Sequence, residues 1–298
     1  TKLVEVEDLY RPYKEKKKTK ATEAIKNGLE PLAKMIMSFP TKGSIDSLVS
    51  KFINENVKTK EDAITGAGYI IAEYISDNAS YRKWIRNYTY KNGIIVTKVK
   101  KDNPDEKKVY EMYYEYTEKV REIKPHRILA INRAENEKVL TVNIDIDRDE
   151  VISFLEKRVI KDDKSFVNEI VKDSIKDSYK RLIEPSIERE IRSDLTERSE
   201  EQAIKVFGKN AKQLLLQPPI KEMTVMGFDP AYRTGCKIAV IDKTGKLLDT
   251  TTVYPTEPQN DVEGAKKVLK ELIKKHKVNM IAIGNGTASR ESETFVSN

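Results

Sequence analysis

The sequence is poor in the residues that build metal centres and covalent cross-links. Cys236 is the only cysteine among 298 residues, which excludes a disulfide framework and a thiolate metal cluster. The two histidines, His126 and His276, have no second histidine or cysteine at ligand spacing, so no zinc site is predicted. No apolar run approaches the roughly 20 residues of a membrane helix, and the first ten residues do not resemble a signal peptide. We therefore expect a cytoplasmic protein with no membrane partner.

Charge is present in quantity but is nearly balanced. The 55 basic and 48 acidic residues give a net charge of +7. This excess is compatible with nucleic-acid binding, although a local basic patch is more informative than the net charge of the whole chain. The length suggests about two domains.

Residues 1–217 are predicted to form a mainly helical region. Thr59, followed by Glu61 and Asp62, is typical of a helix N-cap, and Ser80 is expected to cap the next helix. Short β-branched stretches at 93–99 and 139–146 predict a small β element. A long helix is expected over about 186–216, with a stripe at i, i+4 and i+8 formed by Ile187, Ile191 and Leu195. Pro218-Pro219 is the predicted domain boundary.

Residues 222–298 show a compact α/β pattern. An apolar strand ends on Asp229-Pro230, a loop with Gly235 follows, and a second apolar run returns at 236–241. The order βββαβα predicts the first portion of an RNase H-like fold, whose sheet order would be 3-2-1-4-5. The last strand and helix of that fold are not in the sequence, so we expect a piece of a longer protein.

Long stretches of the chain, in order, resemble the bacterial Tex family of transcription accessory proteins. They are EDLYRPYK (7–14), TKATEAIKNGLEPLA (19–33), PHRILAINR (125–133), YKRLIEPSIEREIRSDLTERSEEQAI (179–204), LLLQPP (214–219), GFDPAYRTGCKIAVID (227–242) and AIGNGTASRE (282–291). The resemblance implies a helical region with helix-turn-helix-like elements and then a YqgF-type RNase H-like domain, here truncated at its C-terminus. It also implies nucleic-acid binding, of RNA or DNA, and a role in transcription. The family's C-terminal OB-fold RNA-binding domain falls outside this sequence.

Asp229 stands where RNase H-like enzymes hold their divalent ions. That chemistry needs three or four converging carboxylates around Mg²⁺ or Mn²⁺. The fourth strand should carry the second carboxylate, but Gly284 or Asn285 occupies that place. Without it, Asp229 is also explained as a turn residue before a Gly-bearing loop. We expect no catalytic residue and no cofactor in this portion; Mg²⁺ or Mn²⁺ would be needed only if Asp229 served a nuclease.

Two segments are candidate phosphate-binding sites. The loop from Gly284 leads into a helix, and free N–H groups at a helix start suit a phosphate; Thr287 or Ser289 as a simple N-cap is the alternative. The basic run near the N-terminus could equally be a solvated charge run. The candidate nucleic-acid-binding residues are Arg233, Lys237, Asn285, Thr287, Ser289 and Arg290 in the first set, and Lys16, Lys17 and Lys18 in the second.

The leading hypothesis is a nucleic-acid-binding transcription accessory factor whose RNase H-like domain is inactive. One alternative is a metal-dependent nuclease or resolvase that uses Asp229. Another is a protein-docking platform, for which the long helix after Pro185 is suited, with RNA polymerase or other transcription machinery as partner.

Overall fold

In the computed structural model, residues 3–102, 104–218 and 220–298 are described, and the chain divides into two compact units, 1–210 and 211–298. Pro219, part of the predicted boundary, lies outside the described residues. No helix of the described residues is long and apolar enough to cross a bilayer. The first unit is mostly helical and the second is a small α/β domain with a mixed sheet, as the sequence predicts.

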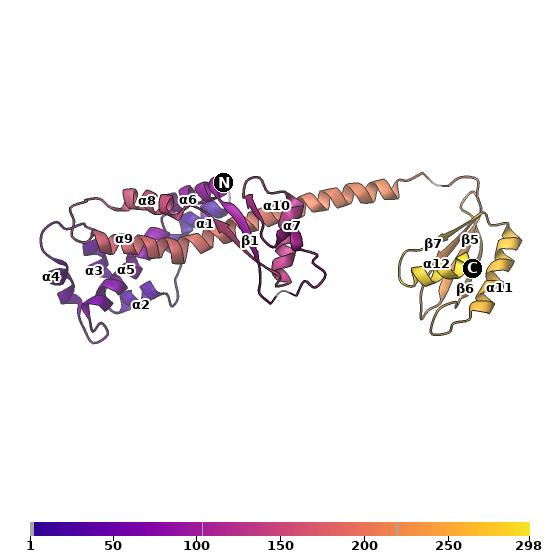
Figure 1. Cartoon of the computed structure of the whole chain (residues 1–298), viewed down its shortest axis with the longest axis horizontal. Coiled ribbons are helices and arrows are strands. Elements are labelled where there is room, and N and C mark those ends of the chain that lie inside the picture. Colours follow the sequence, from indigo (N-terminus) through magenta and orange to yellow (C-terminus); the bar gives the residue numbers. More distant parts are fainter. Residues whose placement is uncertain (1–2, 103, 219) are drawn as a thin grey trace. The chain divides into compact units, whose positions relative to one another are not determined.

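Helices dominate the first unit (Figure 1). They are α1 (Leu3–Tyr10), α2 (Lys20–Lys26), α3 (Glu30–Ile36), α4 (Ile45–Val49), α5 (Lys60–Ser76), α6 (Ala79–Asn92), α7 (Pro125–Asn136), α8 (Arg148–Val159), α9 (Asn168–Asp177) and the start of α10 (Glu184–Leu215). The strands β1 (Ile94–Val99), β2 (Thr117–Lys119) and β3 (Leu140–Asp145) form an antiparallel sheet in the order β2-β1-β3.

Local capping chemistry explains where two of these helices begin. The Thr59 side chain accepts from the Asp62 N–H at 3.0 Å, and the Asp62 carboxylate accepts from the Thr59 N–H at 3.1 Å, so the predicted N-cap of α5 is confirmed. The predicted Ser80 cap is wrong. Asn78 caps α6 instead, because its side-chain oxygen accepts from the N–H groups of Ser80 and Tyr81.

Helix α10 is continuous with a π-helical segment, Ser178–Ile183, that joins it to α9. Pro185, expected to restart the helix, lies in the first turn of α10, directly after this wider segment. Proline lacks an N–H donor and clashes with the carbonyl one turn earlier, and a widened turn accommodates it. Ile187, Ile191 and Leu195 are buried, which confirms the predicted stripe. Alongside it lies α7, whose Asn132 amide donates to the Thr196 hydroxyl at 2.8 Å.

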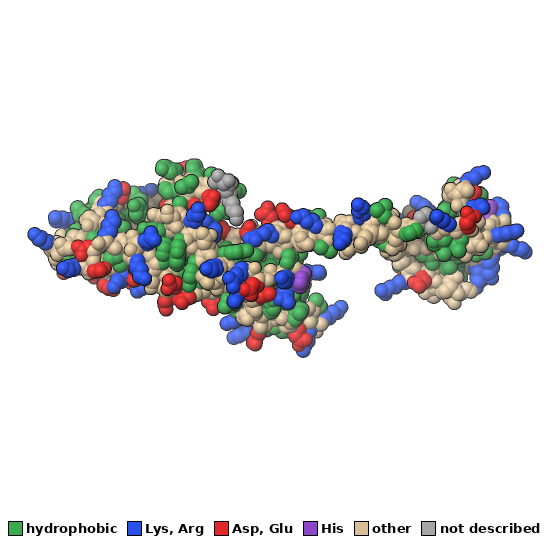
Figure 2. Space-filling model, turned by 90° about the horizontal axis from the view of Figure 1, so that it is seen from above, with side chains coloured by type: hydrophobic (Ala, Val, Ile, Leu, Met, Phe, Trp, Pro, Cys, Tyr) green, Lys and Arg blue, Asp and Glu red, His purple; other side chains and the backbone are tan. Residues whose placement is uncertain are grey.

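The distal half of α10, from Glu200 onward, does not pack against the rest of the first unit. All residues from Glu200 to Asn210 are exposed, and Phe207 is 73% exposed. Residues 202–217 contain three lysines and no acid. Figure 2 shows basic and apolar side chains along this part of the helix.

An ionic cluster buried in the first unit joins α1 to α6 and α10. The Asp8 carboxylate accepts from Arg82 Nε at 2.7 Å and from Arg86 Nη2 at 2.6 Å. Glu190 accepts from the same two guanidinium groups, at 2.7 and 2.9 Å. The Arg82 side chain is fully buried and that of Asp8 is 5% exposed. Such charges are tolerated in an interior only when paired in this way.

The second unit has a four-stranded sheet in the order β6-β5-β4-β7, which confirms the predicted order as far as the described strands go. Its elements are β4 (Val225–Asp229), β5 (Cys236–Ile241), β6 (Leu247–Val253), α11 (Val262–His276), β7 (Met280–Ile283) and α12 (Ser289–Ser297). Met226, Phe228 and Ile238 are buried on one face of the sheet, in one core with Leu269 of α11. Cys236 is also fully buried there.

Candidate nucleic-acid interface

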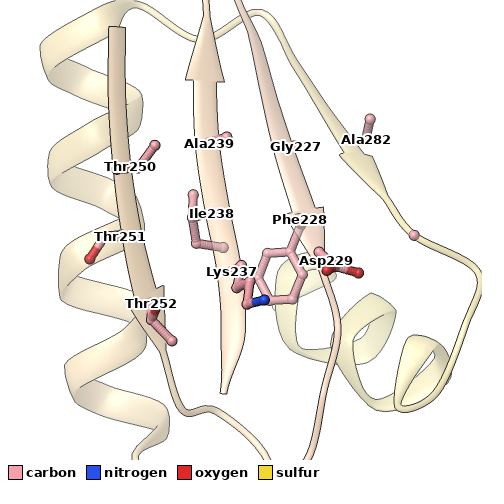
Figure 3. Close-up of a pocket in the computed structure, with 11 residues that line it drawn as sticks. Gly227, Phe228, Asp229, Lys237, Ile238, Ala239, Thr250, Thr251, Thr252 and Ala282 are labelled. Atoms are coloured by element: carbon pink, nitrogen blue, oxygen red, sulfur yellow. The ribbon is translucent and has the colours of Figure 1, made fainter. Parts of the chain in front are cut away.

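The face of the second sheet that points away from α11 is shallow and lined by small side chains. Because side chains alternate along a strand, Gly227 and Ala239 lie on the opposite face from their buried neighbours. With Ala282 and Thr250 they line a pocket of about 540 Å³. Figure 3 shows α11 behind the sheet and the pocket in front of it, with Asp229 and Lys237 towards one end.

Among the described residues, Asp229 is the only carboxylate that lines this pocket. It ends β4, and the neighbouring parallel strand β7 is followed by Gly284, whose N–H donates to the Phe228 carbonyl at 2.8 Å. A Cβ added to Gly284 would lie 3.6 Å from Asp229 Oδ1. The place beside Asp229 where a second carboxylate would stand is therefore occupied by a residue without a side chain.

A lysine faces Asp229 from the other side. Lys237 on β5 is the direct cross-strand partner of Asp229 in the antiparallel register. Both residues line the pocket, and Figure 3 shows them towards the same end of it. A positive charge at this end of the pocket disfavours a divalent cation. Among the described residues, no group of three or more Asp, Glu, His or Cys side chains could hold a metal ion.

The loop between β4 and β5 is tied to the first turn of α12. The Tyr232 hydroxyl donates to Glu291 at 3.0 Å, and this hydrogen bond to a carboxylate raises the pKa of Tyr232. Arg233 and Arg290 adjoin these two residues in sequence, and both are exposed. The structure thus brings the two predicted arginines to neighbouring segments at the Asp229 end of the sheet.

The start of α12 differs from the predicted N-cap. Neither Thr287 nor Ser289 caps the helix; Ala288, in the left-handed conformation with φ +60°, precedes it and offers no side-chain acceptor. A left-handed residue turns the chain sharply enough that the expected hydroxyls are not positioned over the first turn. Asn285 and Thr287 are exposed in the loop before it. The uncapped N–H groups form the kind of helix start at which anions bind.

The basic residues near the N-terminus belong to the first unit and form a separate candidate surface. Lys16 makes ion pairs with Glu73, at 3.2 Å, and with Asp77, so it fastens its segment to α5. Lys17 and Lys18 are exposed. The sequence could not distinguish the paired lysine from its neighbours, since both acids lie more than 50 positions away.

Thr250, Thr251 and Thr252 were not singled out from the sequence, yet all three line the pocket. Their signal was a run of β-branched hydroxyl residues in a strand. Thr252 pairs with Lys237 in register and extends the polar row that begins at Asp229.

Two family models match the chain, the Tex central region-like model over residues 42–207 and the Tex protein YqgF-like domain over residues 223–298. The uncharacterised protein YdcI of Bacillus subtilis (strain 168) is 52% identical over 300 residues, covering 100% of this chain and 42% of that protein. Transcriptional accessory protein Tex of Neisseria gonorrhoeae is 36% identical over 293 residues, covering 97% of this chain and 38% of that protein. S1 RNA-binding domain-containing protein 1 of Homo sapiens is 35% identical over 305 residues, covering 98% and 30%. The chain thus spans well under half the length of these relatives.

Proposed function

The chain belongs to the Tex family, and from this membership we propose that it is the scaffold portion of a transcription accessory protein that binds nucleic acid and does not cut it. The observation that carries this proposal is the isolation of Asp229, with Gly284 on one side and Lys237 on the other. Two-metal hydrolysis needs carboxylates that converge on both ions. A lone carboxylate facing an ammonium group supplies neither site.

The same end of the sheet suits phosphates. Lys237, Arg233 and Arg290 supply positive charge, and the start of α12 supplies free N–H groups. The loop hydroxyls and amide of Thr287, Ser289 and Asn285 add hydrogen-bonding capacity. One relative is named for transcription and another for an S1 RNA-binding domain, which supports nucleic acid as the partner class.

Binding should be measured by fluorescence anisotropy of labelled single-stranded RNA, and of matching DNA, at several salt concentrations. We expect the logarithm of the association constant to fall with the logarithm of salt by about 0.7 per phosphate engaged. A variant with Arg233→Ala, Lys237→Ala and Arg290→Ala should reduce that slope by about 2, since three contacts are removed.

The matched control carries Lys267→Ala, Lys270→Ala and Lys274→Ala on α11, on the opposite side of the sheet. It loses the same charge, and its slope should change by less than half as much. An equal reduction of the salt slope in both variants would show that the net charge of the chain, and not this surface, governs binding. Absence of binding at low salt would refute the proposal for this chain.

The nuclease alternative is tested with the same oligonucleotides and added Mn²⁺. We expect no cleavage above the buffer rate, because Asp229 lacks a second carboxylate. Asp229→Ala should leave the cleavage rate at the buffer level and should not weaken binding, because a carboxylate at this end of the sheet repels phosphate. Cleavage that Asp229→Ala abolishes would instead establish a metal-dependent nuclease.

A second candidate function is protein docking, which the distal half of α10 favours. Ile204, Phe207, Leu214 and Leu215 are each at least 66% exposed, and large exposed apolar side chains in a row are typical of interaction surfaces. The test is a pull-down from nuclease-treated lysate with the immobilised chain. Polymerase subunits that are retained by the wild type and lost with Phe207→Asp would indicate protein docking rather than tethering through nucleic acid.

A further inference from the structure

A groove of about 450 Å³ opens on the first unit, between α3, α5 and the C-terminal end of α8. Its floor is apolar and buried: Ala33, Ile71, Ile75 and Val159 are each at most 4% exposed. Met37, Ile70, Tyr74 and Tyr81 complete the lining together with the charged residues Glu30, Lys34, Arg158 and Lys161. The groove thus has an apolar floor and charged residues along its rim.

Two of the polar groups that line the groove have partners within the first unit. The Asn78 side-chain oxygen caps α6, and the Tyr81 hydroxyl donates to the Arg158 carbonyl at 3.5 Å. A nucleobase placed here would bury hydrogen-bonding edges against apolar walls, which is costly when they stay unsatisfied. An apolar side chain incurs no such cost. The lining therefore favours a protein segment over a nucleic acid.

The rim carries an excess of positive charge. Within the described ranges, Glu30 is the only acid that lines the groove, and its carboxylate pairs with Lys34 at 2.7 Å. Arg158 lies over the Phe154 ring, 5.4 Å from its centroid, and neither Arg158 nor Lys161 has an ion pair among the described residues. Two cations next to an apolar groove are complementary to a segment that combines carboxylates with an apolar anchor.

Tyr74 stands at the mouth of the groove with 69% of its surface exposed. Among the described residues its ring has no aromatic or cationic partner. Tyrosine and arginine are both enriched among the residues that contribute most of the binding energy at protein interfaces.

We propose that this groove binds an acidic amphipathic helix of a partner protein, with an apolar side chain on the groove floor and carboxylates against Arg158 and Lys161. The recognition mode is a helix in a groove, in which side chains at i, i+3, i+4 and i+7 supply the anchors. The site is distinct from the sheet surface of the second unit and does not depend on nucleic-acid binding there.

The only tryptophan provides a reporter close to the groove. Trp84 stacks on Phe154, with ring centroids 3.7 Å apart, and Phe154 meets the edge of the Tyr81 ring at 6.3 Å. The probes are synthetic helical peptides of about 15 residues with Leu, Phe or Met anchors, glutamate at the remaining outward positions, and neither Trp nor Tyr. A matched set carries lysine in place of each glutamate.

We expect at least one acidic peptide to bind saturably, seen as a change in Trp84 fluorescence and as amide shifts confined to the groove helices. Tyr74→Ala should weaken its binding about tenfold or more, as should the pair Arg158→Glu and Lys161→Glu. The control pair Lys17→Glu and Lys18→Glu makes the same charge change outside the groove and should retain the affinity within about twofold.

The proposal is overturned if no acidic peptide binds, if the lysine peptides bind equally well, or if the groove variants match the control pair. It is also overturned if single-stranded RNA displaces the peptide from the wild type and binds the groove variants more weakly, since the groove would then be a nucleic-acid site. Thermal unfolding of each variant, followed at Trp84, verifies that these surface changes leave the fold intact.

Discussion

Asp8→Ala is expected to lower the free energy of unfolding of the first unit by about 3–5 kcal/mol, the usual cost of removing one partner from a buried charge cluster. In the wild type, Arg82 and Arg86 share the carboxylates of Asp8 and Glu190. Without Asp8, two guanidinium groups face one carboxylate, and the fully buried Arg82 loses the acceptor of its Nε–H. Arg82 Nη1 already has no partner within the described part of the chain, so further rearrangement offers little relief.

Urea denaturation followed at Trp84 measures this effect, because the single tryptophan lies on α6 beside Arg82 and reports on the first unit alone. The matched control is Lys83→Ala. Lys83 pairs with Glu5 at 3.3 Å across the same two helices, but both side chains are exposed, so the change should cost less than about 1 kcal/mol. A similar loss of stability in Asp8→Ala and Lys83→Ala would contradict the special role of the buried charge cluster.

The double variant Asp8→Leu with Arg82→Met should recover most of the lost stability. It replaces a charge pair by apolar side chains and leaves Arg86 paired with Glu190. Replacing a whole buried pair is often close to neutral, whereas removing half of it is not. If the double variant were as unstable as Asp8→Ala, the packing of α1 would depend on the shapes of these side chains and not on the pairing of their charges.

Gly284→Asp is expected to give the second unit a Mn²⁺ site at the end of its sheet. The new Cβ would lie 3.6 Å from Asp229 Oδ1, so two carboxylates would converge at the end of the sheet. Two carboxylates at close range repel each other, and a divalent cation with oxygen ligands relieves that repulsion. The Cβ would also lie 3.2 Å from Pro230 Cδ, so the proline ring must shift by a few tenths of an ångström to admit the new side chain.

Mn²⁺ binding can be followed by electron paramagnetic resonance of the free ion. We expect dissociation constants of about 0.1–1 mM for Gly284→Asp, the weak end of carboxylate sites. Adding Lys237→Ala should tighten binding further, because the opposing ammonium charge is removed. Gly284→Asn is the uncharged control and should bind no better than the wild type. Equal binding by the Asp and Asn variants would show that Asp229 does not take part.

Local sequence patterns predicted much of the fold. The spacing of Ile187, Ile191 and Leu195 predicted the packed face of α10. Two apolar runs separated by a Gly-bearing loop predicted the hairpin that carries Asp229. These features depend on residues a few positions apart, so their periodicity is visible in the sequence.

Features that depend on distant residues or on competing local contacts were missed. Asp8 and Arg82 are 74 positions apart, and nothing in either neighbourhood marks them as partners. The direct opposition of Asp229 and Lys237 follows from strand register, which a one-residue slip would abolish. Asn78, and not Ser80, is the N-cap of α6. Ala288, and not Thr287 or Ser289, stands at the N-cap position of α12. Both predictions failed because several residues near each helix start could occupy the one N-cap position.

The exposed half of α10 must hold its helical conformation without tertiary support. Residues 202–217 contain no acid, so Glu201 with Lys205 is the single Glu–Lys pair at i, i+4 that the sequence offers this half, and Gly208 costs about 1 kcal/mol relative to alanine. An unsupported helix of this length is close to the balance point of its helix–coil equilibrium. Any surface that covers Phe207 therefore also supplies the free energy that keeps the segment helical. Folding of this half and its association are then one thermodynamic step, and the measured affinity is smaller than the contact energy by the cost of ordering the chain.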